Sequence, residues 1–498
     1  FFRLSAAEGQ KDFNLYELVP STTSAVFVTD DVLEFVAEVD ELTCSKNQQY
    51  LYVSKLFSYL KQSLYALSED TPHGLSRQMN QMLISFHEPD NERNQVLYCR
   101  LGNGDKELVN RFVRKYISSL YPPKTFVYKG EEIIIYPMAD GDFLACYLTS
   151  DFMALSFQKK LIENVIDAYK SGKSLADDST FTGIRAPKKS AAAATIYTRM
   201  QGMMGWTEFD MKMKDDFIYF SGITHDADTC FAFINQLRQQ QSVKGFPGEV
   251  LPSTAFYFSR QGITDWVSLL SYGNAQGQSV PARTSEVQNR DKEFSRYLME
   301  NAGQDLVACL FQREDTLQGA AAVLSLSVAD VTEAERMLRA LVNAASADEG
   351  RRNPRITFCY TVNKAYPIYR LPQTTLFEQL TSFAEPTLDV YAAFYGGRLL
   401  LAPDADALAH YIRQLDKGEV LNGAMVYQTG MDHLSDSYHF MLMADFDHIF
   451  QQSENHVRFV PDFFLRNADF FRHFTLFVQF ACADGVVYPN IVLKYKSE

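Results

Sequence analysis

Short apolar or alternating runs, typical of strands, are interspersed along the chain with segments whose apolar residues recur at helical spacing. In "QKKLIENVIDAY" this spacing places Leu161, Val165 and Tyr169 on one face of a helix. In "AAFYGGRLLLA" two apolar runs flank Gly396-Gly397, which predicts an antiparallel hairpin. Hairpins mixed with helices favour an α+β fold over a doubly wound parallel sheet.

The same order of patterns occurs twice along the chain. "VPSTTSAVFVTDDVLEFV" from Val19 returns as "LPSTAFYFSRQGITDWV" from Leu251, and further matches follow in the same order, including paired hairpin turns. The sequence therefore predicts two tandem copies of one α+β unit, residues 1–240 and 241–498. Each copy is expected to form an antiparallel or mixed sheet with packed helices.

Composition changes this picture little. The chain has 498 residues, 46% of them hydrophobic and 22% charged, which is ordinary for a folded protein. A formal net charge of -14 argues against nucleic acid and anionic membrane surfaces as partners, because proteins bind both of these mainly through Lys and Arg. The 7 cysteines are scattered and show no C-x-x-C spacing, so they predict neither a disulfide framework nor a zinc site.

The N-terminal end bears on location. The chain opens "FFRLSAAEGQ" without methionine, as if cut just after an apolar segment, and no run within it reaches the roughly 18 to 20 apolar residues that span a bilayer. We expect an extracytoplasmic protein, periplasmic or at the cell surface, that contacts the membrane only through a segment absent from this chain. The alternative is an arbitrary boundary in a cytoplasmic protein.

The short motif "THDADTC", Thr224–Cys230, combines side chains that could bind a metal or act in catalysis: a histidine, two carboxylates and a thiol. Similar Asp-containing segments, "SVADVTE" and "APDADAL", also lie between a strand-like run and an amphipathic helix. Asp and Thr at such positions accept hydrogen bonds from unpaired amides of the first helical turn. We therefore expect Thr224, Asp226 and Asp228 to cap a helix over Phe231–Gln239, with metal binding as the alternative.

Histidines concentrate late in the chain, and "MDHLSDSYHFMLMADFDHIF" mixes them with carboxylates and a serine. The residues concerned are Asp432, His433, Asp436, Ser437, His439, Asp445, Asp447 and His448. These side chains could compose a metal site or a Ser-His-Asp set, but their spacing matches no metal or nucleophile motif. The paired carboxylates Glu131-Glu132 and Asp215-Asp216 fall where hairpins or strand ends are expected, which favours solvated turns over acid-base catalysis.

One segment, "RMQGMMGWTEF", combines methionines, glycines and a tryptophan between strand-like runs. Exposed on a loop, Met200, Met203, Met204 and Trp206 would make an adaptable apolar surface for a partner. Buried, the same residues are core. A late Phe-rich segment is expected to form a helix face that covers the second copy.

The "V/L-P-S-T" turn that opens each copy resembles duplicated bacterial cell-envelope proteins of the domain-of-unknown-function type. The resemblance covers the two "P-S-T" starts and the general layout. It implies an extracytoplasmic, anchored, two-copy protein, and it supplies no catalytic residues.

The leading interpretation is a non-enzymatic extracytoplasmic binding or scaffold protein whose ligand is a protein or an envelope component, held in a groove between the copies. No catalytic residue, cofactor or metal ligand is assigned, and the oligomeric state is left open. The alternative is a metal-dependent or other hydrolase that uses the late His/Asp cluster. A structural spacer is the third hypothesis.

Overall fold

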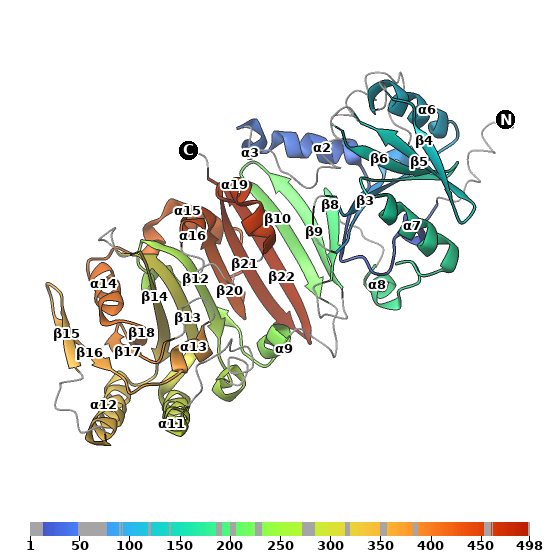
Figure 1. The fold of residues 1–498 in the computed structure, drawn as a ribbon. Helices are drawn as coiled ribbons and strands as arrows, with labels where there is room; N and C mark the ends of the chain where they lie inside the picture. Colours follow the sequence, from blue (N-terminus) through green and yellow to red (C-terminus); the bar gives the residue numbers. More distant parts are fainter. Residues whose placement is uncertain are drawn as a thin grey trace. The chain divides into compact units, whose positions relative to one another are not determined.

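The computed structural model describes residues 13–47, 77–88, 91, 93–117, 121–138, 141–185, 192–199, 206–224, 232–270, 284–313, 319–348, 356–381, 387–452, 460 and 462–496. The chain divides into two compact units, Phe1–Thr229 and Cys230–Glu498, a boundary close to the one predicted from the sequence (Figure 1). Each unit is described below by itself.

Unit 1 contains ten described strands in antiparallel ladders. Their order across the unit is β10–β9–β8–β1–β2–β3–β7–β6–β5–β4. Their bounds are β1 (Ala25–Thr29), β2 (Met82–Phe86), β3 (Gln95–Arg100), β4 (Lys124–Tyr128), β5 (Glu131–Pro137), β6 (Phe143–Leu148), β7 (Phe152–Ser156), β8 (Ala194–Thr198), β9 (Thr207–Lys214) and β10 (Phe217–Thr224).

Several helical segments of unit 1 pack on this sheet. The described helical segments of the unit are η1 (Leu15–Leu18), α2 (Val32–Glu41), α3 (Thr43–Lys46), α5 (Arg77–Asn80), α6 (Asp105–Phe112), η2 (Val113–Ile117), α7 (Lys159–Ser171) and α8 (Ser179–Ile184). The core lies where η1, α7 and α8 meet the sheet (Figure 1). Helix α7 buries Ile162, Val165 and Ile166, whereas Tyr169 is 39% exposed, so the predicted apolar face is rotated slightly from the observed one.

Unit 2 contains twelve described strands. Ten run in the order β22–β21–β20–β12–β13–β14–β18–β17–β16–β15, all antiparallel, and β11 and β19 form a separate short ladder. Their bounds are β11 (Val243–Lys244), β12 (Ala255–Gly262), β13 (Ala302–Gln312), β14 (Ala320–Val328), β15 (Ile356–Tyr360), β16 (Ala365–Arg370), β17 (Tyr391–Tyr395), β18 (Arg398–Ala402), β19 (Ser437–Tyr438), β20 (Phe440–Asp445), β21 (Phe474–Ala483) and β22 (Val486–Tyr495).

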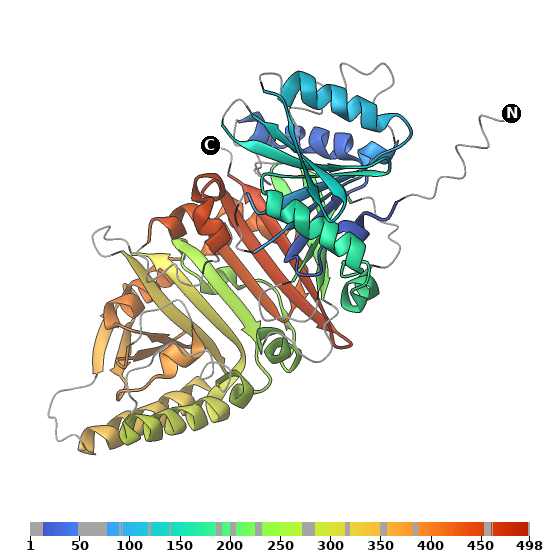
Figure 2. The ribbon, with the colours of Figure 1, turned by 45° about the vertical axis from the view of Figure 1, so that its right-hand side comes forward.

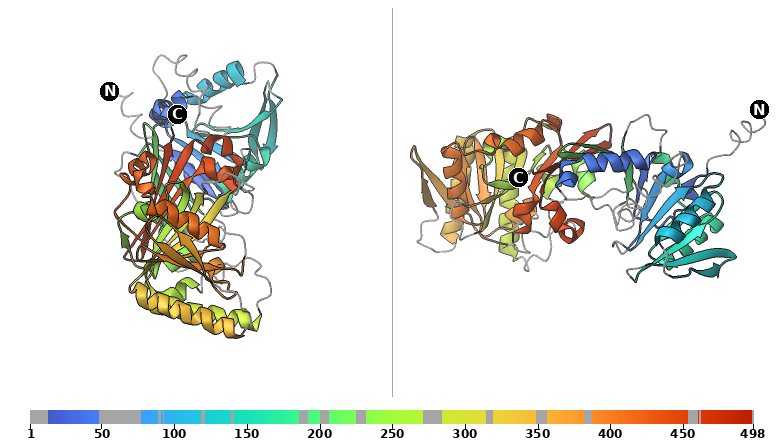
Figure 3. Two further views of the ribbon diagram at one scale, coloured as in Figure 1. Left: turned by 90° about the vertical axis from the view of Figure 1, so that its left-hand side faces the viewer. Right: turned by 90° about the horizontal axis from the view of Figure 1, so that it is seen from above.

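The described helices of unit 2 include two long neighbours, α11 (Ser285–Asn301) and α12 (Val331–Asp348), which lie side by side (Figures 2 and 3). The hydroxyl of Tyr297 on α11 donates to the carbonyl of Ala334 on α12 at 3.0 Å. The shorter helices are α9 (Ala232–Arg238), η3 (Pro247–Val250), α13 (Leu376–Leu380), α14 (Ala405–Asp416), η4 (Leu421–Gly423), α15 (Met425–Met431), α16 (Phe446–Phe450), α18 (Asp462–Arg466) and α19 (Ala468–Phe471).

The turns predicted from the sequence are confirmed as hairpins. Gly396-Gly397 joins β17 to β18, and Asp215-Asp216 joins β9 to β10. Asp215 and Asp484 have φ of 50° and 51°, the left-handed conformation that two-residue hairpin turns require. A short polar side chain such as Asp tolerates this conformation better than most residues do.

The predicted fold class needs correction. We expected two tandem copies, each with a sheet of its own, but apart from the β11–β19 ladder the described strands belong to one 20-stranded antiparallel sheet that is not closed. The architecture is thus one unclosed sheet rather than two sheets, one to a copy. Local patterns specify strands and turns, whereas the partner of an edge strand depends on contacts distant in sequence.

The late Phe-rich segment also differs from the predicted single helix face. It forms two short helices, α18 and α19, and then enters β21 at Phe474. Phe471 and Phe474 are buried, and Phe464 packs on Phe446 with ring centroids 4.9 Å apart. None of the described helices is long and apolar enough to cross a membrane.

Candidate functional site

The "THDADTC" motif, Thr224–Cys230, lies largely outside the described residues. Thr224 ends β10, is 5% exposed, and has its hydroxyl 3.2 Å from that of Thr207. Thr224, predicted as a capping residue, is thus observed as the last residue of a strand. Residues 225–231 are not described, so the capping role of Asp226 and Asp228 stays a prediction. The following helix, α9, is observed over Ala232–Arg238.

The two similar segments, "APDADAL" and "SVADVTE", do cap helices. Asp404 Oδ1 accepts from the amide of Ala407 at 2.7 Å at the start of α14. Asp330 Oδ1 accepts from the amide of Glu333 at 3.1 Å at the start of α12. Both carboxylates satisfy amides that have no partner within the helix, as the sequence pattern predicted.

The late His/Asp cluster does not converge in the described structure. Asp445 caps α16 and lies 2.7 Å from Lys496 Nζ and 3.3 Å from His448 Nδ1. His439 Nδ1 instead accepts from the backbone amide of Cys482 at 3.2 Å. Among the described residues, no group of three or more His, Cys, Asp or Glu side chains is arranged to hold a metal ion.

The paired carboxylates lie at hairpins. Glu131 begins β5, lies 2.8 Å from Lys170 Nζ, and accepts from the hydroxyl of Tyr147 at 3.0 Å. Asp215 and Asp216 form the β9–β10 turn. Both pairs therefore lie at hairpin turns or strand ends, which supports the turn explanation.

The Met/Trp segment is only partly described. Trp206 is 1% exposed and packs edge-to-face on Phe181, with ring centroids 5.0 Å apart, while the Arg199 guanidinium lies 5.0 Å from the Trp206 ring. Trp206 is therefore a core residue and not part of an exposed interaction surface, because its indole fills the space beneath α8. Met200, Met203 and Met204 lie outside the described residues, and their role in an interaction loop stays a prediction.

Sequence reasoning missed a buried polar relay in unit 1. Ser85 Oγ lies 2.8 Å from His87 Nε2 and 3.0 Å from the hydroxyl of Tyr98. The signal was present in "LISFHEP", because residues two apart on a strand share a face. Burial lowers the pKa of His87 to about 4.

The geometry of this relay suggests a serine nucleophile beside a base, but its surroundings do not. Ser85 and Tyr98 are 0% exposed and His87 is 6% exposed, so a substrate has no access to the serine oxygen. A histidine that stays neutral down to about pH 4 is also a poor proton acceptor at neutral pH. We therefore assign the relay a structural role.

The strongest candidate site is a polar pocket of about 480 Å³ in unit 1. It lies beside the ends of β1 and β3, near the start of β2 and along β8, and η1 and the residue after α8 complete it. Its lining residues are Leu15, Tyr16, Val28, Thr29, Asp30, Gln81, Met82, Leu83, Arg100, Arg185, Ala192, Ala193, Ala194, Thr195 and Tyr197. This volume is within the roughly 300–1,000 Å³ of typical small-ligand pockets.

Local structure holds the charged side chains of the pocket in place. Arg100 Nε donates to the carbonyl of Phe13 at 2.5 Å, and the Arg185 guanidinium stacks 3.8 Å from the ring centroid of Tyr16. Asp30 Oδ1 accepts from Gln81 Nε2 at 2.5 Å. Two guanidinium groups and one carboxylate therefore line the same pocket.

These charges act on one phenol. Burial raises the pKa of Tyr16 to about 12, against the opposing effect of Arg185, and Asp30 raises it further while Arg100 lowers it. Tyr197, on the neighbouring strand β8, also has a pKa raised by burial. Both phenols are consequently protonated at neutral pH, and each can donate or accept a hydrogen bond.

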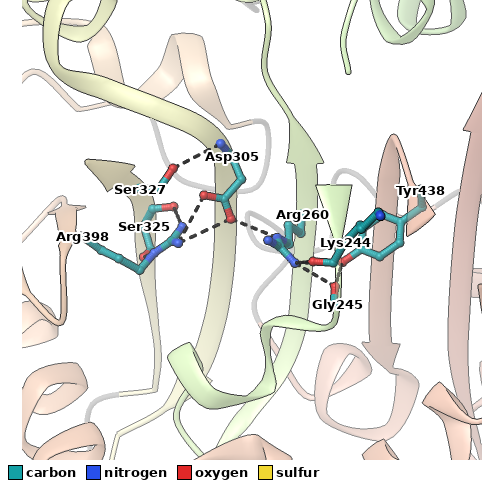
Figure 4. A network of polar contacts seen from close by, with 8 residues as sticks. All are labelled: Lys244, Gly245, Arg260, Asp305, Ser325, Ser327, Arg398 and Tyr438. Atoms are coloured by element: carbon teal, nitrogen blue, oxygen red, sulfur yellow. Dashed lines mark hydrogen bonds and ion pairs between the residues drawn. The ribbon is translucent and has the colours of Figure 1, made fainter. Parts of the chain in front are cut away.

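Unit 2 contains a second polar cluster, drawn in Figure 4. Asp305 on β13 lies between two guanidinium groups: Arg260 Nε is 2.9 Å from Asp305 Oδ2, and Arg398 Nη1 is 3.2 Å from Asp305 Oδ1. Arg398 also donates to the Ser325 hydroxyl at 2.6 Å, and Arg260 donates to the hydroxyl of Tyr438 at 3.2 Å. The cluster thereby connects β12, β13, β14 and β18 to the short β11–β19 ladder.

This cluster is a structural clamp. Burial would raise the pKa of Asp305, but the charges of Arg398 and Arg260 and the hydrogen bond from Ser327 hold it below its ordinary value. Asp305 is 5% exposed, and its carboxylate is shared between the two arginines. A carboxylate so held is unsuited to proton transfer at neutral pH.

Comparisons with known proteins give no relative. No family model matches the chain, and neither the curated proteins nor the solved structures include a significant match. The resemblance to duplicated envelope proteins therefore stays a prediction.

Proposed function

We propose that this is a non-enzymatic binding protein that holds a small anionic ligand in the pocket of unit 1. The proposal is carried by one observation: Arg100 and Arg185 line a pocket with a single carboxylate, Asp30. The three charged groups of the lining carry a formal excess of one positive charge in a chain whose net charge is -14, while Glu208 lies outside the lining and raises the pKa of Tyr16 and Tyr197. A local excess of positive charge in an acidic protein favours an anionic ligand.

The polar groups around these charges suit hydrogen-bond recognition. Guanidinium groups bind carboxylates and phosphates through parallel N–H donors. The hydroxyls of Tyr16 and Tyr197 belong to the same lining. Those of Thr29 and Thr195 also line the pocket, but they donate to the carbonyl of Ala193 and to Asp210 Oδ1. A carboxylate or phosphate group on a small molecule is the chemistry that this lining fits best.

The lining supports binding rather than catalysis. It contains no serine, cysteine or histidine, the residues that most often act as nucleophile or general base. Its two tyrosines have raised pKa values, which makes them weak acids and unsuited to give up a proton at neutral pH. The extracytoplasmic location and a protein or envelope partner remain predictions from the sequence.

Isothermal titration calorimetry on the full chain tests the proposal. The probes are inorganic phosphate, succinate and L-glutamate, with glucose as a neutral probe. We expect saturable binding of at least one anion and none of glucose. Arg185→Met should weaken that binding roughly 10- to 100-fold, because it removes charge-assisted hydrogen bonds and keeps a long side chain.

Arg336→Met is the matched control, because Arg336 is an exposed arginine of unit 2 with 68% of its side chain accessible. It should leave anion binding unchanged. Absence of binding by all three anions, or equal affinity of wild type and Arg185→Met, would overturn the proposal.

A further inference from the structure

The pocket of unit 1 contains charges of both signs that do not pair with one another. Its lining includes the carboxylate of Asp30 and the guanidinium groups of Arg100 and Arg185. Asp30 is exposed and accepts a hydrogen bond from Gln81, and no ion pair joins it to either arginine within the part of the chain that the structure describes. A ligand that carries only negative charge would be repelled by this carboxylate, whereas a ligand with a cationic group would be attracted to it.

The strand register explains why Asp30 and Arg100 share the pocket without touching. Val28 of β1 lies opposite Leu83 of β2, which lies opposite Tyr98 of β3. Asp30 and Arg100 follow Val28 and Tyr98 by two residues, and residues two apart along a strand share a face. Because β2 lies between β1 and β3, their backbones are two strand spacings apart, roughly 10 Å. A small molecule can bridge such a gap between two side chains.

Negative charge continues from Asp30 toward β8 and β9. Asp210 of β9 lies opposite Thr195 of β8, and its Oδ1 accepts from the Thr195 hydroxyl at 3.2 Å. Glu208, two residues earlier on β9, lies opposite Tyr197 and therefore shares that face of the sheet. The guanidinium groups of the lining come instead from β3 and from the residue after α8. The surroundings of the pocket thus favour a ligand that carries both signs of charge and binds in one orientation.

We propose that the ligand of this pocket is an acidic amino acid, a zwitterion with one ammonium group and two carboxylates; this rests on the anion-binding function proposed above. The ammonium group donates to Asp30, and the two carboxylates accept from Arg100 and Arg185. Two guanidinium groups and one carboxylate match these three ligand groups in number and in sign. The ligand keeps a net negative charge, in agreement with the excess positive charge of the lining.

The size and the apolar part of the pocket suit such a ligand. A volume of about 480 Å³ lies toward the lower end of the range for small-molecule sites. Val28, Leu83 and Ala194 contribute apolar side chains to the lining, against which the methylene groups of an amino acid can pack. Inorganic phosphate has no such apolar part and no cationic group, so it would use only some of these contacts.

Calorimetric titration of L-glutamate and of glutarate into the full chain tests this assignment, because glutarate keeps both carboxylates and lacks the amine. Wild type should bind L-glutamate at least about tenfold more tightly than glutarate, since only L-glutamate donates a charge-assisted hydrogen bond to Asp30. L-alanine, which keeps the amine and one carboxylate, should also bind at least about tenfold more weakly than L-glutamate. Asp30→Asn should reverse the preference, because it removes the partner of the ammonium group and the repulsion of glutarate.

The matched control is Asp31→Asn, which removes the carboxylate next in sequence. Asp31 does not belong to the lining, and its Oδ1 accepts from the amide of Glu34 at 2.9 Å at the start of α2. Asparagine caps helices about as well as aspartate does, so this variant should fold normally. It should leave the ratio of the L-glutamate and glutarate affinities unchanged.

The outcomes separate this inference from the function on which it rests. Wild type that binds glutarate or L-alanine as tightly as L-glutamate, or an unchanged affinity ratio in Asp30→Asn, would overturn the zwitterion and leave the anion site standing. Binding of phosphate without binding of L-glutamate would do the same. If no anion binds, both proposals fail. The comparison of ligands on wild type is decisive by itself and does not depend on how well Asp30→Asn folds.

Discussion

His87 illustrates how burial alone sets the chemistry of a residue. Its side chain is 6% exposed, and burial lowers its pKa to about 4 from an ordinary value near 6.5. The folded protein therefore keeps His87 neutral at pH values where the unfolded chain binds a proton. The stability from this residue is fully present above about pH 6.5 and is lost as pH falls toward about 4.

We expect the unfolding free energy to fall by roughly 3 kcal/mol between pH 6.5 and 4 because of His87, since each unit of pKa shift corresponds to about 1.4 kcal/mol. Urea unfolding of wild type and of His87→Gln over this pH range, followed by a probe that reports on unit 1, measures the effect. The variant should show a shallower loss of stability over this range. His433→Gln, on an exposed histidine, is the control, and equal slopes for wild type and His87→Gln would contradict the assignment.

The roles of some single residues could be predicted correctly from the sequence, and those of others were missed. The capping roles of Asp404 and Asp330 follow from a local pattern, because the acceptor and the amide are three residues apart. The environment of Trp206 does not follow from its neighbours in sequence, since Phe181 supplies the packing. The Ser85–His87 contact could have been expected from strand alternation, but its burial could not.

At the scale of elements, Asp305 holds several strands together. Its carboxylate bridges Arg260 of β12 and Arg398 of β18. Asp305→Asn would leave two partly buried guanidinium groups without their counter-charge, and removing one partner of a buried ion pair typically costs about 3–5 kcal/mol. We expect a loss in unfolding free energy of that order, measured by guanidinium denaturation at neutral pH.

The pH dependence has a definite sign. Because the folded pKa of Asp305 lies below its ordinary value, its contribution is present above about pH 4 and is lost as pH falls through the folded pKa. Asp389→Asn is the matched control: Asp389 pairs with Arg370 at the surface, and exposed pairs contribute about 0–1 kcal/mol. A loss for Asp305→Asn no larger than for the control would show that the clamp does not stabilise the unit.

Elements with a strong local signal were predictable from the sequence. The hairpins at Gly396-Gly397 and Asp215-Asp216 follow from turn residues between apolar runs. The buried face of α7 was predicted only approximately, because helical spacing defines a stripe and the neighbouring core decides which of its residues are covered. The break of the Phe-rich segment into α18, α19 and β21 had no local signal that we recognised.

At the scale of the whole molecule, the sequence predicted an antiparallel or mixed sheet with packed helices in each of two copies, and not the single unclosed sheet. Alternation specifies which face of a strand is buried and does not identify the strand beside it. The pocket was missed for a related reason. Its charged residues Asp30, Arg100 and Arg185 come from distant segments, and only the fold brings them together.

The central claim is that the charges of this pocket select an anion. Calorimetric titration of phosphate into the full chain carrying Asp30→Asn tests it most directly, beside wild type and Arg185→Met. Removing the single carboxylate while keeping an amide that can still accept from Gln81 should tighten phosphate binding several-fold, and Arg185→Met should weaken it. Unchanged or weaker binding by Asp30→Asn would contradict the account.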